Sequence, residues 1–287
     1  MRLYSIEPSA FSARTAARDK VNFTLNAESI RKPAPMPQSN RVTDGVAVID
    51  IRGVMLAAPD VFDEMFGGFV NTRSVQKQVE AAADDRAVKA IILRIDSPGG
   101  SVDGLAELGD AVSRARHQKP VIAQVEGLCA SAAFYAASAA SEISAGRMDL
   151  IGSIGTIVTI YDVSAAFKTA GIKTIVIASG QLKGTATLGT ELTSAEEVYL
   201  RDIVNKYFDD FRRTVFSGRG RFIGPGEWAE IASGKVYVTS DAMKLGLVDR
   251  IGTFAGTMRR LAAQPLSPVQ QTQARAQRQR LALMGVS

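Results

Sequence analysis

Short apolar runs alternate with amphipathic stretches between residues 45 and 264. The runs at 46–51, 90–95 and 121–125 are rich in Val, Ile and Leu, which is typical of buried strands. The stretches 72–83 and 102–116 place their apolar residues at helical spacing. Strands that alternate with helices predict an α/β fold with largely parallel pairing, in a single core domain.

The pattern continues with four further elements. We expect a small-residue helix from Ser131, a strand at 156–160, a helix at 163–169 and a strand at 174–178. One long helix is predicted from Thr193 to Phe216. Thr193 is a good N-cap, and Glu196 three residues later completes a capping box.

The two ends of the chain differ from this core. Residues 1–43 are polar and end in closely spaced prolines, which favour an extended N-terminal arm or linker. Residues 265–287 are rich in Gln and Arg and are expected to form a tail that is either mobile or a lone helix. The core domain is therefore predicted to cover residues 44–264.

The charge distribution argues against a nucleic-acid enzyme. The net charge is +5, but the first 43 residues contribute +4 and the last 23 contribute +3, so the body between them carries −2. A nucleic-acid enzyme is expected to carry its basic surface on the folded body. No apolar run is long enough to predict a membrane anchor, and the single Cys129 fits a reducing compartment. We expect a cytoplasmic protein without cofactor or metal.

Two segments could carry chemistry. The turn Ser97–Gly100 could be an ordinary tight turn, or its glycines could let backbone N–H groups at a helix start approach a ligand, as in an oxyanion hole. Ser131 could be a small residue of a packed helix. It could also be a nucleophile exposed at a helix start, with the Ala132 N–H facing the developing charge.

A nucleophilic serine needs a base. The only histidine, His117, lies at the predicted end of a surface helix, so the base is expected to be a lysine held neutral by burial or crowding. By composition alone, Lys183 is an ordinary exposed loop lysine.

Five motifs in order resemble the signal peptide peptidase (SppA) family of serine peptidases over residues 45–262. They are Asp96–Gly100, Ala130–Tyr135, Gly152–Gly155, Ser179–Lys183 and Leu245–Asp249. The resemblance implies the Clp protease/crotonase fold, a spiral of strand-strand-helix units, and a Ser/Lys dyad.

Carried over by motif, the resemblance implies a role for each site residue. Ser131 would be the nucleophile and Lys183 the general base. Gly100 and Ala132 would supply the oxyanion N–H groups, with Gly99 shaping the turn, and Ser153 would hold the lysine amine. Membrane enzymes of the family often have Ser-Gly-Gly where this chain has Ser-Ala-Ala, so the pocket could be narrower.

The resemblance also implies partners. In short family members the serine and lysine can meet across a protomer boundary, so we expect a homo-oligomer acting on protein or peptide substrates. The missing anchor and the basic tail favour a head maturation protease of a prophage, cutting capsid and scaffold proteins inside the assembling prohead. The alternatives are a cytoplasmic peptidase of general turnover, a crotonase-type acyl-CoA enzyme and an inactive assembly protein.

Overall fold

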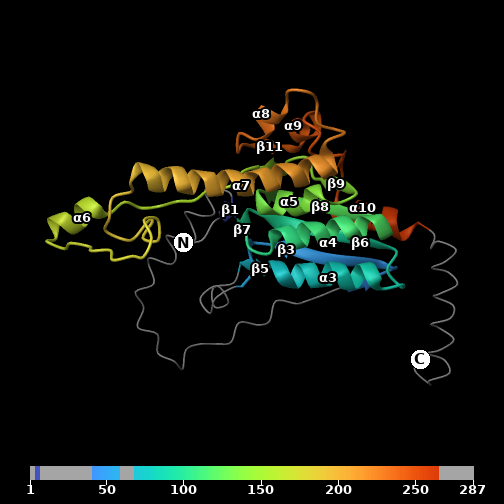
Figure 1. Cartoon of the computed structure of the whole chain (residues 1–287). Coiled ribbons are helices and arrows are strands. Elements are labelled where there is room, and N and C mark those ends of the chain that lie inside the picture. The colour runs from blue at the N-terminus through green and yellow to red at the C-terminus, as the bar shows by residue number, and fades with distance from the viewer. Residues whose placement is uncertain (1–3, 7–40, 59–67, 265–287) are drawn as a thin grey trace, which may run out of the picture.

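The computed structural model describes residues 4–6, 41–58 and 68–264 (Figure 1). The predicted arm is described only at residues 4–6 and 41–43, and the predicted tail at 265–287 lies outside the described residues. The proposed domain boundaries therefore stay a prediction. Among the described residues, no helix combines the length and apolar character needed to cross a bilayer.

A large, mainly parallel sheet forms the centre of the domain. Its path runs β11 (Val236–Val238), β10 (Leu150–Gly152), β8 (Val121–Ala130), β6 (Ala90–Ser97), β3 (Val46–Arg52) and β2 (Arg41–Thr43). The four inner strands are parallel, and the two outermost strands pair antiparallel. Beside this path, β9 (Glu142–Ala145) pairs with β8 and with β12 (Arg250–Ile251).

A second, smaller sheet stands at the end of the parallel strands. Its order is β1 (Tyr4–Ile6), β7 (Gly99–Ser101), β4 (Val54–Leu56) and β5 (Phe69–Asn71). The chain twice passes from a long strand of the large sheet through the small sheet into a helix, with two short strands, β4 and β5, the first time and one, β7, the second. The helices of the first two units are α3 (Thr72–Asp84) and α4 (Leu105–Gln118). The expected α/β core of strand-strand-helix units is confirmed.

Alternate residues of β6 serve two hydrophobic layers. Ile91, Leu93 and Ile95 belong to the main core, which α3 and α4 cover, whereas Ala90 and Ile92 belong to a smaller cluster on the other face. This division follows from the period of two along a strand. The smaller cluster is closed by α10 (Phe254–Ala262). Because both faces of β6 are buried, its sequence is almost continuously apolar and does not alternate with polar residues.

The predicted long helix is confirmed as α7 (Ser194–Arg219). Its capping box forms as expected: the Glu196 N–H donates to Thr193 Oγ1 at 3.3 Å, and the Thr193 N–H donates to Glu196 Oε2 at 2.9 Å. The small-residue helix is α5 (Ala132–Ser138), which packs against α7. Two short helices, α8 (Trp228–Ile231) and α9 (Thr239–Lys244), follow α7.

Residues 156–192 form an arm that projects from the core beside the first turns of α7 (Figure 1). The predicted helix is present as α6 (Ser164–Thr169). The strands predicted at 156–160 and 174–178 are wrong, because the first has a single bridge position and the second has no strand. Ile175 and Ile177 are 72% and 96% exposed. Their β-branched side chains favour a strand, but a strand needs a partner edge and a face to bury.

Candidate active site

Ser131 occupies a strained backbone position where β8 turns into α5. Its φ of 54° and ψ of −119° lie in the positive-φ part of the backbone map, which non-glycine residues rarely adopt. The Ser131 N–H donates to the Gly152 carbonyl at 2.8 Å, and the side chain is almost fully buried. Such strain costs about 1–3 kcal/mol and is concentrated at functional sites. The geometry is that of a strand-to-helix turn that presents a nucleophile.

The glycine turn is held very close to a neighbouring strand. Gly99 has a φ of +93°, and its N–H donates to the buried Ser97 hydroxyl at 3.2 Å. Gly100 lies opposite Met55 in the pairing of β7 with β4, where a Cβ would overlap the Met55 backbone. Only glycine therefore fits at Gly100 without a backbone shift.

The sheet register brings the glycine turn and Ser131 to the same end of the domain. Ser97 lies opposite Cys129 where β6 pairs with β8, so the residues that follow each strand emerge together. Helix α5 also contacts β7 directly. Ala132 is the first residue of α5, and the N–H groups of a helix start have no partner within the helix. Gly100 and Ala132 can thus present N–H groups near the Ser131 hydroxyl.

Ser153 joins the same group. Gly152 lies opposite Ala130 where β10 pairs with β8, so Ser131 and Ser153 follow neighbouring strand ends. Ser153 has a φ of 51° and is 6% exposed, and its N–H donates to the Lys235 carbonyl at 2.7 Å. Two serines on strained, buried turns therefore lie side by side.

Within the described residues, Lys183 is the one predicted site residue that does not lie with this group. It lies in the projecting arm and its side chain is exposed. In Figure 1 this part of the arm stands well to one side of α5. A lysine acts as a base only where burial or crowding keeps it neutral.

Two other candidate bases lie away from Ser131. His117 is exposed in the last turn of α4, as expected for a surface position. Lys119 is buried, and burial lowers its pKa, but its amine donates to the carbonyls of Ala82, Asp85 and Val88 at 2.8 to 3.0 Å. Lys119 precedes β8 whereas Ser131 follows it, so about 30 Å of strand separates them.

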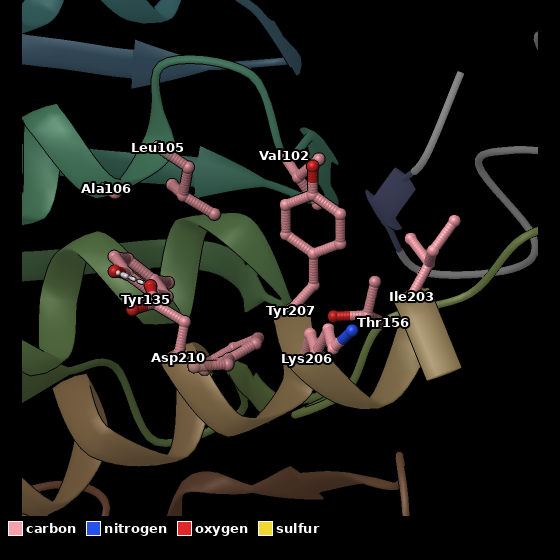
Figure 2. Close-up of a pocket in the computed structure, with 10 residues that line it drawn as sticks. Val102, Leu105, Ala106, Tyr135, Thr156, Ile203, Lys206, Tyr207 and Asp210 are labelled. Atoms are coloured by element: carbon pink, nitrogen blue, oxygen red, sulfur yellow. Dashed lines mark hydrogen bonds between the residues drawn. The ribbon is translucent and has the colours of Figure 1, made fainter. Parts of the chain in front are cut away.

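A cavity of about 520 Å³ opens beside these motifs (Figure 2). Val102, Tyr135 and Thr156 line it, and each lies within a site motif or within two residues of its end. The face of α7 closes it, through residues that the sequence did not single out: Ile203, Lys206, Tyr207, Asp210 and Phe211. Their only sequence signal is the helical spacing of α7.

The cavity combines an apolar wall with one fixed polar pair. The Tyr135 hydroxyl donates to Asp210 Oδ2 at 2.8 Å, and burial raises the pKa of the phenol, so it stays a donor at neutral pH. The Tyr135 ring packs edge-on against Phe211, with 5.3 Å between centroids. The arrangement suits a ligand side chain that is mainly apolar.

Sequence comparison identifies the family. The model of peptidase family S49 matches residues 113–266, more than half of the chain. The chain belongs to peptidase family S49. The match includes Ser131, Ser153 and Lys183 and all of α7. The expected membership of the signal peptide peptidase family is thereby confirmed.

Several curated proteins are similar to this S49 chain. A putative protease of Methanocaldococcus jannaschii is 33% identical over 177 residues, which cover 62% of this chain and 56% of that protein. Protease 4 of Haemophilus influenzae is 29% identical, over 74% of this chain and 34% of that protein. Capsid assembly protease C of Escherichia phage lambda is 30% identical, over 51% and 33%. The chain spans from a third to somewhat over half of these relatives.

Solved structures resemble the S49 chain more distantly. A membrane-bound stomatin-specific protease is 17% identical with a TM-score of 0.46, covering 75% of this chain and 83% of that chain. An enoyl-CoA hydratase/isomerase family protein from Silicibacter pomeroyi is 16% identical with a TM-score of 0.48, covering 80% and 84%.

Proposed function

We propose that the chain is a serine endopeptidase in which Ser131 is the nucleophile and Lys183 is the general base. The observation that carries the proposal is the strained turn of Ser131 at the start of α5, beside the glycine turn at Gly99 and Gly100. Membership of a peptidase family supports the same chemistry. The acyl-CoA alternative has no need of an activated serine, so the turn of Ser131 does not favour it.

The reaction would transfer the acyl group in two steps. The neutral Lys183 amine takes the Ser131 proton while the hydroxyl oxygen attacks the scissile carbonyl carbon, and the N–H groups of Gly100 and Ala132 stabilise the oxyanion. The C–N bond then breaks, and Lys183 returns the proton to the leaving amine. In the second step Lys183 takes a proton from water while the water oxygen attacks the ester carbonyl carbon. The bond to Ser131 Oγ then breaks, and Lys183 returns the proton to that oxygen, which restores the free hydroxyl and the neutral amine.

We place Lys183 at Ser131 of a neighbouring copy in a homo-oligomer. The arm that carries Lys183 exposes a set of large apolar side chains that an isolated chain leaves in water: Tyr161, Ile172, Ile175, Val176, Ile177 and Leu188. Contact with a second copy would bury this surface and desolvate the lysine amine. Ser153, beside Ser131, would accept a hydrogen bond from that amine and so position it.

For the substrate, we propose capsid and scaffold proteins of an assembling prophage head. Two relatives carry phage head names: capsid assembly protease C of phage lambda, and a head-tail preconnector protein of Enterobacteria phage P21 that is 32% identical over 50% of this chain. The second candidate is a peptidase of general turnover, which the cellular relatives named protease 4 favour. The cavity beside Tyr135 would take an apolar substrate side chain in either case.

Labelling by a fluorophosphonate probe tests the chemistry, because the probe forms a covalent bond only with an activated serine. Intact mass should show one probe on the wild-type chain, none on Ser131→Ala, and at least about a hundredfold slower labelling on Lys183→Ala. The matched control is Lys173→Ala, an exposed arm lysine that should label at the wild-type rate. Labelling of Ser131→Ala, or equal rates for Lys183→Ala and the wild type, would contradict the proposal.

A further inference from the structure

The N-terminal segment Tyr4–Ile6 forms a strand on the edge of the small sheet. It pairs antiparallel with β7, in a register that sets Tyr4 opposite Ser101, Ser5 opposite Gly100 and Ile6 opposite Gly99. On its other side β7 pairs with β4. β1 therefore covers what would otherwise be the free edge of the glycine strand (Figure 1).

This edge is also the proposed reaction centre. Gly100 is the middle residue of the pairing, and its N–H is one of the two proposed oxyanion donors. An extended substrate whose scissile carbonyl reaches Gly100 must run along the same strand, because adding a strand to an open sheet edge is how extended peptides commonly bind. A substrate and β1 would therefore need the same backbone positions.

From this overlap we infer that the chain's own N-terminal segment competes with the substrate for the edge of β7. The inference rests on the proposed peptidase function. Residues 7–40 connect β1 to β2, so the segment stays tethered to its site. Covalent attachment makes the binding of the segment intramolecular, which raises its effective concentration at the edge of β7 and lets three pairing residues compete. A short strand is also easily displaced, so a substrate with more pairing positions and a side chain in the cavity would win.

The test removes the backbone donors of β1 without touching the catalytic group. Neighbouring N–H groups of a strand point to opposite sides, so one of the N–H groups of Ser5 and Ile6 faces β7. The double variant Ser5→Pro/Ile6→Pro removes both N–H groups and therefore always removes the one that faces β7. The matched control, Ser5→Ala/Ile6→Ala, keeps both N–H groups. Both variants are made in the full chain.

Two readouts separate this inference from the proposed function. In hydrogen exchange, the amides of residues 4–6 and 99–101 should be protected in the wild type and the alanine control. In the proline variant, those amides of 99–101 that face β1 should lose protection, whereas any that face β4 or Ser97 should keep it. In hydrolysis of an extended peptide with an apolar residue at the cleavage site, the proline variant should have a KM roughly three- to tenfold lower with kcat unchanged.

Each outcome decides one of the two claims. The competition would be overturned if the amides of residues 4–6 in the wild type exchange as fast as those of an unfolded chain. It would also be overturned if the proline variant has an unchanged KM. In both cases, hydrolysis of the peptide would still support the peptidase function. The proposed function would be overturned if no variant hydrolyses the peptide and none takes up the probe at Ser131. The competition would then fall as well. Protection of residues 4–6 in the same experiment would still support the pairing of β1 with β7.

Discussion

The Arg219 guanidinium joins the end of α7 to the segment before β12. It is 1% exposed, donates to both carboxylate oxygens of Asp249 at 2.7 and 2.9 Å, and also donates to the Gly246 carbonyl. The Asp249 carboxylate in turn accepts the Ile143 N–H at 2.7 Å, which ties it to β9. This network gives the Leu245–Asp249 motif a structural role: it fixes the position of α7, whose face closes the cavity.

Replacing Arg219 should therefore weaken the whole fold. Arg219→Met leaves the Asp249 carboxylate without its partner in a largely buried site, so the free energy of unfolding should fall by about 3–5 kcal/mol. Arg221→Met is the matched control: Arg221 is exposed and also stacks on Phe222, and its loss should cost about 1 kcal/mol or less. Urea unfolding measures both. Equal losses in the two variants would show that the buried ion pair adds nothing.

Single residues were predictable from the sequence where their signal is local. The capping of α7 by Thr193 and Glu196 depends on residues three positions apart, and it formed as predicted. Arg219 and Asp249 are 30 positions apart, so the sequence could mark Asp249 only as part of a motif and could not name its partner.

Among the elements, the short strand β7 does most to build the site. Its pairing with β4 and β1 is decided by segments far away in the chain, so the sequence predicted a turn at Ser97–Gly100 and gave no sign of a strand. The reverse error occurred at 174–178, where strand propensity was high but the described residues provide no strand pairing. Strand formation depends on a partner edge, which local propensity does not encode.

The first turn of α4 forms one wall of the cavity, which allows the proposed substrate pocket to be filled. Ala106→Phe should place a ring in the space beside Leu105 and Tyr135. The kcat/KM for peptides with a large apolar residue at the cleavage site should fall by about tenfold or more, while peptides with alanine there change little.

The control Ala106→Ser keeps the cavity open and should act like the wild type on both kinds of peptide. A series of peptides that differ only at the cleavage residue supplies the measurement. If Ala106→Phe slows hydrolysis of both kinds of peptide equally, the cavity does not select the side chain.

The whole molecule divides into a compact core that holds Ser131 and an arm that holds Lys183. The sequence motifs predicted the roles of both residues, which stay predictions, and the strand register of the core places Ser131, Ser153 and the glycine turn at the same end of the sheet. The described residues hold Lys183 in the projecting arm, so we propose that it reaches Ser131 of a second copy. The central claim is therefore that the active site is built from two copies.

Mixing two inactive variants tests this claim most directly. Chains with Ser131→Ala still offer Lys183, and chains with Lys183→Ala still offer Ser131. After subunit exchange, the mixture should hydrolyse a peptide that neither variant cleaves alone. As a control, the Lys183→Ala chain mixed with the double variant Ser131→Ala/Lys183→Ala should stay inactive. Exchanged oligomers that recover no activity, or a wild-type monomer that is fully active, would contradict a site shared between copies.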